Sequence, residues 1–448
     1  MIAVKSSAFP ARPGCVTLAD HKDQSRKAAD AAGEGEMARI ELPEQGTPWA
    51  EVSARMDALG AGDVKWRDGK AAVYVFNAGP EIEQVQKEAY AKFASENGLG
   101  PAAFPSLKQM EAEVVGFGLG LLHGDGSCVG NMTSGGTDSI LMAGKAARDH
   151  ARKVRGLTGL LNLVLPRSAH PAFDKACAVM EIEVRRTPLK DLLADPAAME
   201  AVIDGQTIMI VGSAPCFPYG LIDPIEALAE LALRRGVWLH VDACVGGYIA
   251  PFVRMNGAPI PPFDFEVPGV ASISADLHKY GYCAKGASTV FFRSEDLRAH
   301  MIFEVGDWPA GKMVTPTLAG TRPGGAIAAA WAVMNVLGAL GYRAKHGEVT
   351  EARQVIQAGV QAQGWHLLGD PMLGILAFTR DDVNPFAVLK KLYERGWVTS
   401  AVTEPAGLHL MLSPVHKAVA GHYLADLDWA TNAARGDGGK PAEARYGG

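Results

Sequence analysis

A lysine and a histidine stand side by side in the segment SISADLHKYGYCAKG, residues 272–286. Lys279 comes just after an apolar run that predicts a strand, and the ends of such strands are where α/β folds bind their ligands. A lysine forms a Schiff base only as the neutral amine, so burial or a nearby positive charge must lower its pKa. His278 and Lys285 could supply that charge. An isolated lysine on a loop is usually a surface residue, so the interpretation depends on the motifs around it.

An aspartate stands at the end of another apolar run, in HVDACVGG, residues 240–247. A carboxylate is costly at that position without a cationic partner. The protonated ring nitrogen of pyridoxal 5′-phosphate (PLP) is one such partner, because a carboxylate there lets the ring accept electrons from a substrate carbanion. A salt bridge to an arginine, or a cap on a loop, would account for Asp242 taken alone. Together with Lys279 it favours PLP as the cofactor, held as a Schiff base.

Glycines that precede a helical pattern offer a site for the phosphate of PLP. Gly135, Gly136 and Thr137 lead into the apolar-periodic part of NMTSGGTDSILMA, residues 131–143. Backbone N–H groups at the N-terminus of a helix bind phosphate. An ordinary capping loop, with Ser134 or Thr137 as the cap, explains the pattern equally well.

A histidine follows a third predicted strand, in RSAHPAFDKAC, residues 167–177. His170 could lie flat against a pyridine ring, although a histidine at a strand end more often only makes hydrogen bonds. All four elements follow or precede strand ends, so they should converge at one edge of the sheet. That convergence favours a PLP site over the alternative explanation given for each element taken alone.

The middle of the chain alternates between short apolar runs and amphipathic segments, which predicts βαβ units on a largely parallel sheet. The predicted strands are Leu161–Leu165, Ile182–Arg185, Thr207–Val211, Val237–Val241, Ala271–Ala275 and Ser288–Phe292. Helices are predicted at Pro171–Met180 and Pro224–Arg235, the second with Asp223 as its cap and Pro224 in its first turn. The fold class is therefore α/β, with a large, mostly parallel sheet domain.

A smaller α+β domain is expected after this region. A helical stretch at Ala326–Leu340 precedes two or three strands, among them Ile375–Thr379 and Leu408–Leu412. Met37 begins a more structured stretch and could be the natural start of the protein. The expected parts are a flexible arm (1–38), an N-terminal segment (39–110), a large PLP-binding domain (111–340), the C-terminal α+β domain (341–435) and a flexible tail (436–448).

Composition argues against several kinds of partner. The 448 residues carry a net charge of -6, whereas nucleic acid and anionic membranes call for clustered positive charge. The nearest approach to a membrane-spanning run is taken to be the glycine-broken Val114–Leu122, well short of the roughly 20 residues required. The six cysteines show no CxxC pair and no disulfide-scaffold spacing, so we expect reduced, mostly buried thiols in a cytoplasmic protein.

Two further motifs do not support additional binding sites. GFGLG, residues 116–120, has the glycines of a dinucleotide-binding turn but lies inside a predicted helix, not between a strand and a helix. His170, His240 and His278 lack the spacing of metal ligands. We therefore expect neither a dinucleotide site nor a metal site.

Taken together, the motifs resemble those of the sphingosine-1-phosphate lyases and, more distantly, of the PLP-dependent amino-acid decarboxylases of the same fold. The similarity runs from about Trp66 to Arg322, with a weaker match beyond. It is carried by TSGGTDSILMA, SAH, VGSAPCFPYGLIDPI, HVDACVGGYIAPF, SADLHKYGYCAKG and TPTLAGTRPGG. The resemblance implies the PLP-dependent transferase fold type I. It also implies a homodimer with its active site at the subunit interface, to which residues 39–110 contribute.

The same resemblance implies roles for single residues. Lys279 would carry the cofactor, Asp242 would meet its pyridine nitrogen, and His170 would stack on its ring. The residues expected around the cofactor phosphate are Gly136, Thr137, His278 and, from the neighbouring subunit, Gly320 and Thr321. A small-molecule amine would be the substrate.

Near the substrate, the resemblance implies Tyr74 as a candidate acid or base, Lys285 and, less clearly, Tyr219. One departure affects this region. Lyases of the family usually read Asn-Pro-Leu-His-Pro, with a histidine associated with the substrate phosphate, where this chain reads NGLGP, residues 97–101. Gly100 has no side-chain donor, so recognition of that phosphate would fall to Lys285, Tyr219 or other groups. The sequence also shows no counterpart of the membrane-spanning amino-terminal segment of the eukaryotic enzymes.

The resemblance implies cleavage of a phosphorylated long-chain base. A base, either Tyr74 or the released Lys279, takes the proton of the C3 hydroxyl, the C2–C3 bond breaks, and a fatty aldehyde and phosphoethanolamine form. Decarboxylation of an amino acid is the nearest alternative, because it uses the same cofactor and differs in which bond is held perpendicular to the ring. A hypothesis of another class is that the protein binds PLP but does not catalyse a reaction.

Overall fold

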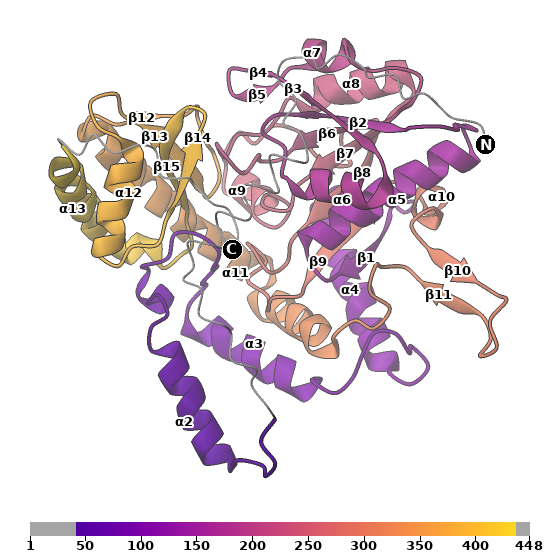
Figure 1. Ribbon diagram of the computed structural model, residues 1–448, viewed down its shortest axis with the longest axis horizontal. Coiled ribbons are helices and arrows are strands. Elements are labelled where there is room, and N and C mark those ends of the chain that lie inside the picture. The colour runs from indigo at the N-terminus through magenta and orange to yellow at the C-terminus, as the bar shows by residue number, and fades with distance from the viewer. Residues whose placement is uncertain (1–41, 436–448) are drawn as a thin grey trace, which may run out of the picture. The chain divides into compact units, whose positions relative to one another are not determined.

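The computed structural model describes residues 42–435 of the chain (Figure 1). The expected arm and tail, Met37 and Cys15 lie outside these residues. The chain divides into two compact units, Met1–Asp63 and Val64–Gly448. In the first unit the described helix is α2 (Trp49–Gly60), none of whose residues is buried. All other described elements belong to the second unit.

A seven-stranded sheet forms the centre of the second unit. Its strands are β1 (Val129–Thr133), β2 (Asn162–Pro166), β3 (Glu183–Thr187), β6 (Thr207–Ser213), β7 (Trp238–Asp242), β8 (Val270–Ala275) and β9 (Ser288–Phe292). They lie in the order β1-β9-β8-β7-β6-β2-β3, and β9 is antiparallel to both of its neighbours while the other pairs are parallel. The predicted α/β fold with a mostly parallel sheet is confirmed.

Helices cover both faces of this sheet. They include α4 (Pro105–Leu121), α5 (Gly136–Lys153), α6 (Ala172–Met180) and α8 (Ile225–Arg235). Successive side chains of a strand point to opposite faces, so Leu163 and Leu165 of β2 join the core around α5 and α6, whereas Val164 joins the core around α4 and α8. Strands buried on both faces read as continuous apolar runs. This is why the sequence located them closely.

The second unit has other described elements before its C-terminal region. They are η1 (Trp66–Asp68), α3 (Pro80–Lys92), β4 (Leu189–Lys190), β5 (Leu193–Ala194), α7 (Pro196–Glu200), α9 (Ala250–Met255), α10 (Glu295–Ala299), β10 (Phe303–Val305) and β11 (Met313–Thr315). GFGLG lies inside α4, as expected.

The C-terminal region follows the long helix α11 (Gly324–Ala362), whose helical geometry is interrupted at Gly338. The boundary expected at residue 340 falls just after this interruption. The region has a four-stranded antiparallel sheet in the order β12-β13-β15-β14. Its elements are β12 (His366–Leu367), β13 (Ile375–Thr379), α12 (Pro385–Glu394), β14 (Ser400–Thr403), β15 (Ala406–Met411) and α13 (His416–Ala434).

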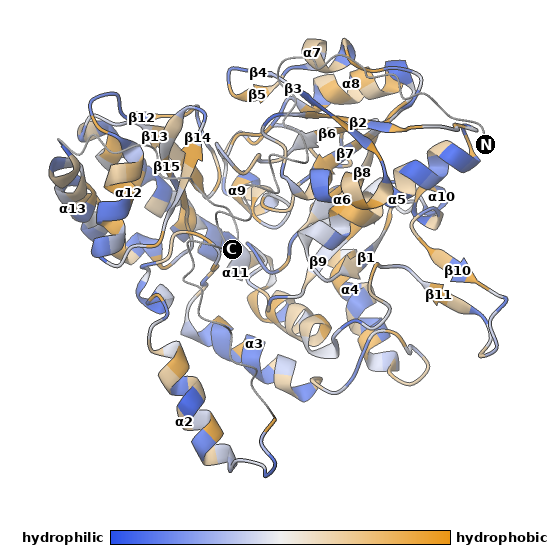
Figure 2. Cartoon of the chain, viewed as in Figure 1, coloured by the Kyte–Doolittle hydropathy of each residue, from blue (hydrophilic) through white to orange (hydrophobic). Residues whose placement is uncertain are grey.

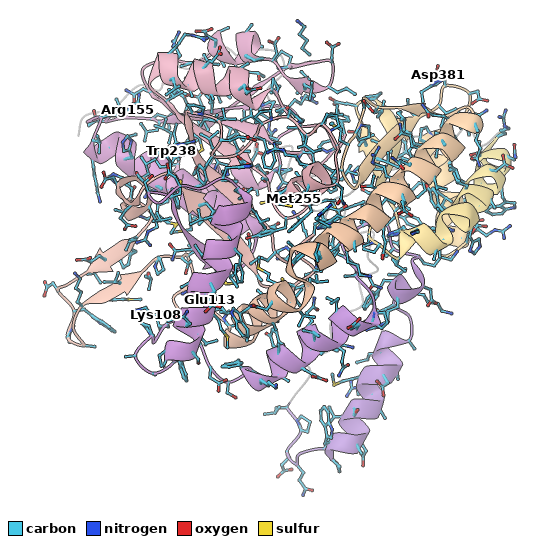
Figure 3. All side chains as sticks on the ribbon, turned by 180° about the vertical axis from the view of Figure 1, so that it is seen from behind. Lys108, Glu113, Arg155, Trp238, Met255 and Asp381 are labelled. Atoms are coloured by element: carbon cyan, nitrogen blue, oxygen red, sulfur yellow. The ribbon has the colours of Figure 1, made fainter. Side chains whose placement is uncertain are left out.

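One described helix, α11, is long and apolar enough to cross a membrane by length and composition alone. Val114–Leu122 is therefore wrong as the nearest approach to such a span. Half of the apolar window in α11 is buried within the protein, and Trp331 of this helix donates to Glu113 of α4 at 2.6 Å. Figure 3 labels Glu113 on α4. Core helices of soluble proteins pass the same test, so the helix is weak support for a membrane span.

Asp223 does not cap α8, contrary to the prediction. The N-cap is Pro224, without a side-chain hydrogen bond. The Asp223 carboxylate instead accepts hydrogen bonds from the backbone N–H groups of Ala194 and Ser213, each at 2.8 Å. Burial raises the pKa of Asp223 to about 6 in spite of these bonds. Asp223 thus ties β5 to the end of β6.

Candidate active site

A cavity of about 370 Å³ lies at the edge of the sheet where the parallel strands end. Its walls come from the segments that follow β1, β2, β6, β7 and β8, because strands that run in one direction bring their carboxyl ends to one edge. The predicted site residues among the lining are Gly135, Gly136, Thr137, His170, Asp242, His278 and Lys279. The ends of Lys279 and Asp242 therefore face one cavity, which is the arrangement on which the sequence interpretation depends.

Lys279 forms a buried ion pair inside this cavity. Its Nζ lies 2.8 Å from Oδ2 of Asp276, whose other oxygen accepts a hydrogen bond from Ser288 Oγ at 2.5 Å. Burial alone would lower the pKa of Lys279, but the charge and hydrogen bond of Asp276, together with Cys244 and Asp242, raise it. Burial likewise would raise the pKa of Asp276, but the charges of Lys279 and His278 and the hydrogen bonds from Lys279 and Ser288 together lower it to about 2.

The expectation that neighbouring cations lower the pKa of Lys279 is therefore wrong for this state of the protein. Burial lowers the pKa of His278, and the carboxylate of Asp276, at the end of the apolar run, helps to raise that of Lys279. Asp276 precedes Lys279 by three residues in SADLHK. That spacing places both groups on one turn of backbone, and it is the signal that could have identified the pair.

Asp242 ends β7 with its carboxylate in the cavity wall. Its Oδ1 accepts hydrogen bonds from the backbone N–H of Cys244 at 3.0 Å and from Ser274 Oγ at 3.3 Å. Within residues 42–435, no arginine or lysine forms a salt bridge with it. The alternative of an arginine partner is thus not found there, and the carboxylate is held in place by neutral donors.

His170 lies in the same cavity, and its ring is held by one hydrogen bond and one aromatic contact. Its Nδ1 accepts a hydrogen bond from the backbone N–H of Ala172 at 3.1 Å, and its ring stands edge-on to Phe217. Burial lowers the pKa of His170. A neutral ring is suited to contact with an aromatic ligand.

The N-terminus of α5 supplies the anion-binding part of the cavity. Gly135 is the N-cap and no side chain caps the helix. Ser134 does not act as the cap, because its backbone N–H and its hydroxyl both donate to Oδ2 of Asp138 at 3.0 Å. The backbone N–H groups of Gly136 and Thr137 therefore remain for a ligand.

Two observations test whether these residues fit the phosphate of PLP. Nδ1 of His278 is buried without a hydrogen-bond partner, and His278 lines the cavity beside this helix N-terminus. A Cβ at Gly136 would lie 2.8 Å from Asp276 Oδ2 and 2.9 Å from Cys244 Sγ, so only glycine leaves the cradle open. A buried ring nitrogen without a partner and an open helix N-terminus both suit a phosphate.

Cys244 and Phe217 line the cavity but were missed as site residues. Cys244 follows Asp242 by two residues in HVDACVGG, and its thiol lies 3.3 Å from Ser274 Oγ. Burial raises the pKa of this thiol, so it is neutral. Each of the five described cysteines is free and buried.

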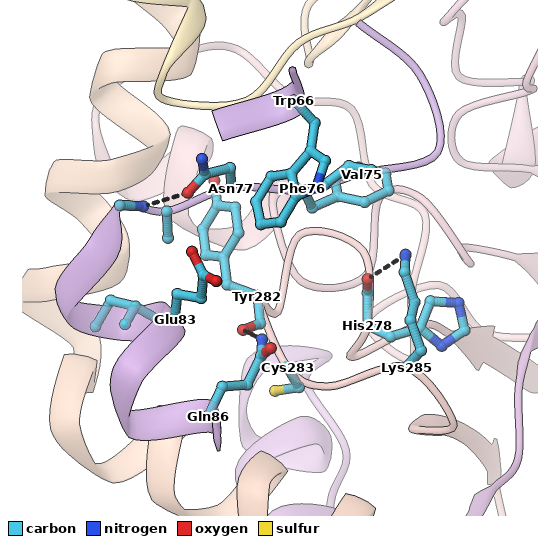
Figure 4. A pocket seen from close by; sticks show the side chains of 13 residues that line it. Trp66, Val75, Phe76, Asn77, Glu83, Gln86, His278, Tyr282, Cys283 and Lys285 are labelled. Carbon is cyan, nitrogen blue, oxygen red and sulfur yellow. Dashed lines mark hydrogen bonds between the residues drawn. The ribbon is translucent and has the colours of Figure 1, made fainter. Parts of the chain in front are cut away.

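Lys285 stands beside a second, smaller cavity of about 100 Å³, whose lining also includes His278, Phe76 and Tyr282 (Figure 4). Its Nζ donates to the carbonyl oxygen of Tyr74 at 3.0 Å and to that of His278 at 3.3 Å. Although Lys285 is an exposed residue, partial burial of its ammonium group, together with the charge of Lys279, lowers its pKa to about 8.

Besides Lys285, four predicted residues do not line the main cavity of their own chain. Tyr74 is 48% exposed and has a left-handed backbone with φ of 63°, which costs energy outside glycine. The hydroxyl of Tyr219 donates to the carbonyl oxygen of Glu404. Gly320 and Thr321 follow β11 and lie outside the cavity lining. The roles of these residues stay predictions.

Comparison with known families agrees with this geometry. The family model described as the pyridoxal-dependent decarboxylase conserved domain matches residues 37–380. A sphingosine-1-phosphate lyase of Oryza sativa subsp. japonica is 43% identical over 399 residues, covering 87% of this chain and 74% of that protein. Sphingosine-1-phosphate lyase 1 of Mus musculus is 38% identical over 391 residues, covering 86% of this chain and 68% of that protein.

Two solved structures also resemble this chain. A sphingosine-1-phosphate lyase of Burkholderia pseudomallei K96243 superimposes with a TM-score of 0.85 at 37% identity, covering 90% of this chain and 95% of that chain. A glutamate decarboxylase of Lactobacillus brevis superimposes with a TM-score of 0.78 at 20% identity, covering 91% and 97%. The second match is a similarity of fold alone.

Replacing Gly136 by alanine should weaken PLP binding. The added Cβ meets Asp276 and Cys244, and such overpacking costs about 1–3 kcal/mol, or roughly 5- to 150-fold in affinity. Titration of the apoprotein with PLP, followed by absorbance, measures the effect. Gly144→Ala is a matched control on the same helix, because its Cβ meets only the flexible end of Met180. Equal PLP affinity in Gly136→Ala and wild type would contradict the proposed cradle.

Replacing Asp276 by asparagine should lower the pH at which PLP joins Lys279. Without the carboxylate charge, burial governs the amine and favours its neutral, reactive form. Visible absorbance of the bound cofactor, recorded across a pH series, should shift its midpoint by at least about one unit. Ser288→Ala, which removes a hydrogen bond to Asp276 but keeps its charge, should stay within about half a unit of wild type. An unshifted or raised midpoint in Asp276→Asn would show that the ion pair does not control Lys279.

Proposed function

Because this chain belongs to the sphingosine-1-phosphate lyase family, we propose that it cleaves sphingosine 1-phosphate, or a similar phosphorylated long-chain base, to a fatty aldehyde and phosphoethanolamine. The protein is a PLP-dependent enzyme of the lyase class. The observation that carries the proposal is the single cavity in which Lys279, Asp242 and the open N-terminus of α5 meet.

Residues of this cavity fit each part of PLP. Gly136, Thr137 and His278 would hold the phosphate, and Lys279 would carry the cofactor covalently. Asp242 would face the ring nitrogen, and the neutral ring of His170 would lie against the ring face. When bound, PLP supplies the electron sink for the pair left at the substrate carbon after bond cleavage.

Residues of the protein itself would accept and hold the proton that the reaction releases. Lys279 is the amine placed in the cavity, and Asp276 holds its ammonium form at 2.8 Å, so a proton taken up at Nζ is stabilised there. Tyr74, the other candidate base, is half-exposed and outside the cavity of its own chain. This favours Lys279 as the group that takes the proton of the substrate hydroxyl within one chain.

We further propose that the enzyme is a homodimer with a shared site. Gly320 and Thr321, which match phosphate-binding positions, do not line the cavity of their own chain, and a neighbouring subunit would bring them to it. A cytoplasmic location is supported by the five described cysteines, all free thiols, as is usual in a reducing compartment.

Amino-acid decarboxylation is the second candidate function. It is favoured by the match to a pyridoxal-dependent decarboxylase domain over residues 37–380. The residues that hold PLP would be the same, and the difference lies in which substrate bond is aligned for cleavage.

Incubation of PLP-loaded protein with sphingosine 1-phosphate, followed by mass spectrometry, tests the proposal. Hexadecenal and phosphoethanolamine should form in equal amounts. Lys279→Ala should lower turnover by at least about a thousandfold, because the covalent link is lost, and should also lose the visible absorbance of bound PLP. Lys153→Ala, at the far end of α5, is a matched control that should keep both.

Two results would contradict the lyase function. Carbon dioxide released from a panel of amino acids, without aldehyde from the phosphorylated base, would establish the decarboxylase. A PLP-loaded protein that turns over no amine in either assay would support a binding protein without turnover.

A further inference from the structure

A buried ion pair outside the main cavity joins distant segments of the chain. Arg322 lies just before α11 and Glu111 lies on α4, and their side chains are 10% and 15% exposed. Nη1 of Arg322 donates to Oε1 of Glu111. Figure 2 shows hydrophilic residues among hydrophobic ones along α4. Buried charges are tolerated when they are paired and hydrogen-bonded, so the other contacts of this pair are informative.

The pair bonds to the backbone of Met132 on strand β1. The N–H of Met132 donates to Glu111 Oε1 at 3.2 Å, and its carbonyl oxygen accepts from Arg322 Nη1 at 3.4 Å. β1 is the last strand of the seven-stranded sheet and pairs on one side only, with β9. An edge strand presents unpaired N–H and C=O groups on its other side. The carboxylate and the guanidinium therefore take the place of a neighbouring strand at this residue.

Met132 leads directly into the proposed phosphate cradle. Only Thr133 and Ser134 lie between it and Gly135, the N-cap of α5. The hydroxyl of Thr133 lies 2.6 Å from that of Ser139 on α5, which joins the strand to the helix across this turn. The N–H groups of the helix can point at a phosphate only while the turn keeps its direction. A constraint on Met132 therefore orients the cradle.

Arg322 is itself fixed through both its side chain and its backbone by Gly98. Its Nη2 donates to the Gly98 carbonyl oxygen at 3.2 Å, and its own carbonyl oxygen accepts from the Gly98 N–H at 2.9 Å. Proline, which the family usually carries at this position, has no N–H to donate. The second bond is thus made possible by the glycine of this chain. Gly320 and Thr321, the residues expected at the phosphate of the neighbouring subunit, come immediately before Arg322.

We propose that Glu111 and Arg322 are positioning residues for the phosphate of PLP. Neither lines the main cavity. They act through Met132 on the cradle of their own chain, and through the backbone of Arg322 on the two residues that precede it. The proposal rests on the PLP site proposed above and not on the identity of the substrate.

This role predicts an effect confined to the phosphate end of the cofactor. Lys279 and Asp242, which are assigned to the other end of PLP, follow or end the strands β8 and β7 in the interior of the sheet. Pyridoxal has the ring and the aldehyde of PLP but no phosphate. Its binding therefore measures the contribution of Lys279 and Asp242 without that of the cradle.

The test compares PLP with pyridoxal in titrations of the apoprotein, followed by absorbance. Arg322→Met should weaken PLP binding about tenfold, because Glu111 and two backbone carbonyl groups each lose a charged donor. Pyridoxal binding should stay within about twofold of wild type. A residue that only supports the fold would change both affinities together or neither.

Arg298→Met is the matched control. Arg298 is partly buried, forms an ion pair with Glu295 and donates at 2.9 Å to the side chain of Asn131, the residue before Met132. It thus bonds to β1 through a side chain and not through the strand backbone. This variant should keep the wild-type affinities for PLP and for pyridoxal.

Two milder variants keep the test decisive if Arg322→Met does not fold. Arg322→Lys retains the charge but has no planar fork to reach several acceptors at once, and Glu111→Gln retains the shape but not the charge. Both should weaken the binding of PLP and leave that of pyridoxal unchanged. Melting temperature identifies the folded variants from which the comparison is made.

Two outcomes would overturn the proposal. Equal losses of PLP and pyridoxal binding in folded variants would assign the pair to general support of the fold, and an unchanged PLP affinity would separate it from the cofactor site. If no phosphorylated base is cleaved, the proposed function fails, while the two affinities still decide the role of the pair. If Gly136→Ala binds PLP like wild type, the cradle fails and the proposal fails with it.

Discussion

The common direction of β1, β2, β6, β7 and β8 is the constraint on which the site depends. Their carboxyl ends meet at one edge of the sheet, so residues more than a hundred positions apart in the sequence surround one cavity. The antiparallel strand β9 contributes at its beginning, because its amino end lies at this same edge. Ser288 there donates to Asp276 and so fixes the carboxylate beside Lys279.

Ion pairing and burial together determine which groups in the cavity are charged. The Lys279–Asp276 pair is ionised because each charge compensates the other's loss of water. Burial is the largest influence on the pKa of His170 and on that of Cys244, and it keeps both groups neutral. Asp242 is held by a backbone N–H and a hydroxyl instead of a cation. The site thus keeps one carboxylate for a cationic ring and one for a protonated amine.

Local pattern was sufficient to predict six of the seven strands of the large sheet, although β1 was not predicted. Ser288–Phe292 and Ile375–Thr379 are strands with the predicted bounds, and Lys279, Asp242, His170 and Gly136 share a cavity because strand direction follows from βαβ order. The hydrogen-bond partners of individual polar side chains could not be predicted in this way. The carboxylate of Asp223 bonds to a distant backbone segment instead of capping α8, and the hydroxyl of Tyr219 is used by Glu404. Such contacts depend on how separate loops pack.

Borohydride reduction of the PLP-loaded protein, followed by peptide mass spectrometry, tests the central claim most directly. Reduction fixes the cofactor to whichever amine carries it. The account predicts the modification on the peptide that contains Lys279, and on that lysine. Modification of Lys285 or of another lysine, or an unmodified protein, would contradict the assignment of this edge of the sheet as the active site.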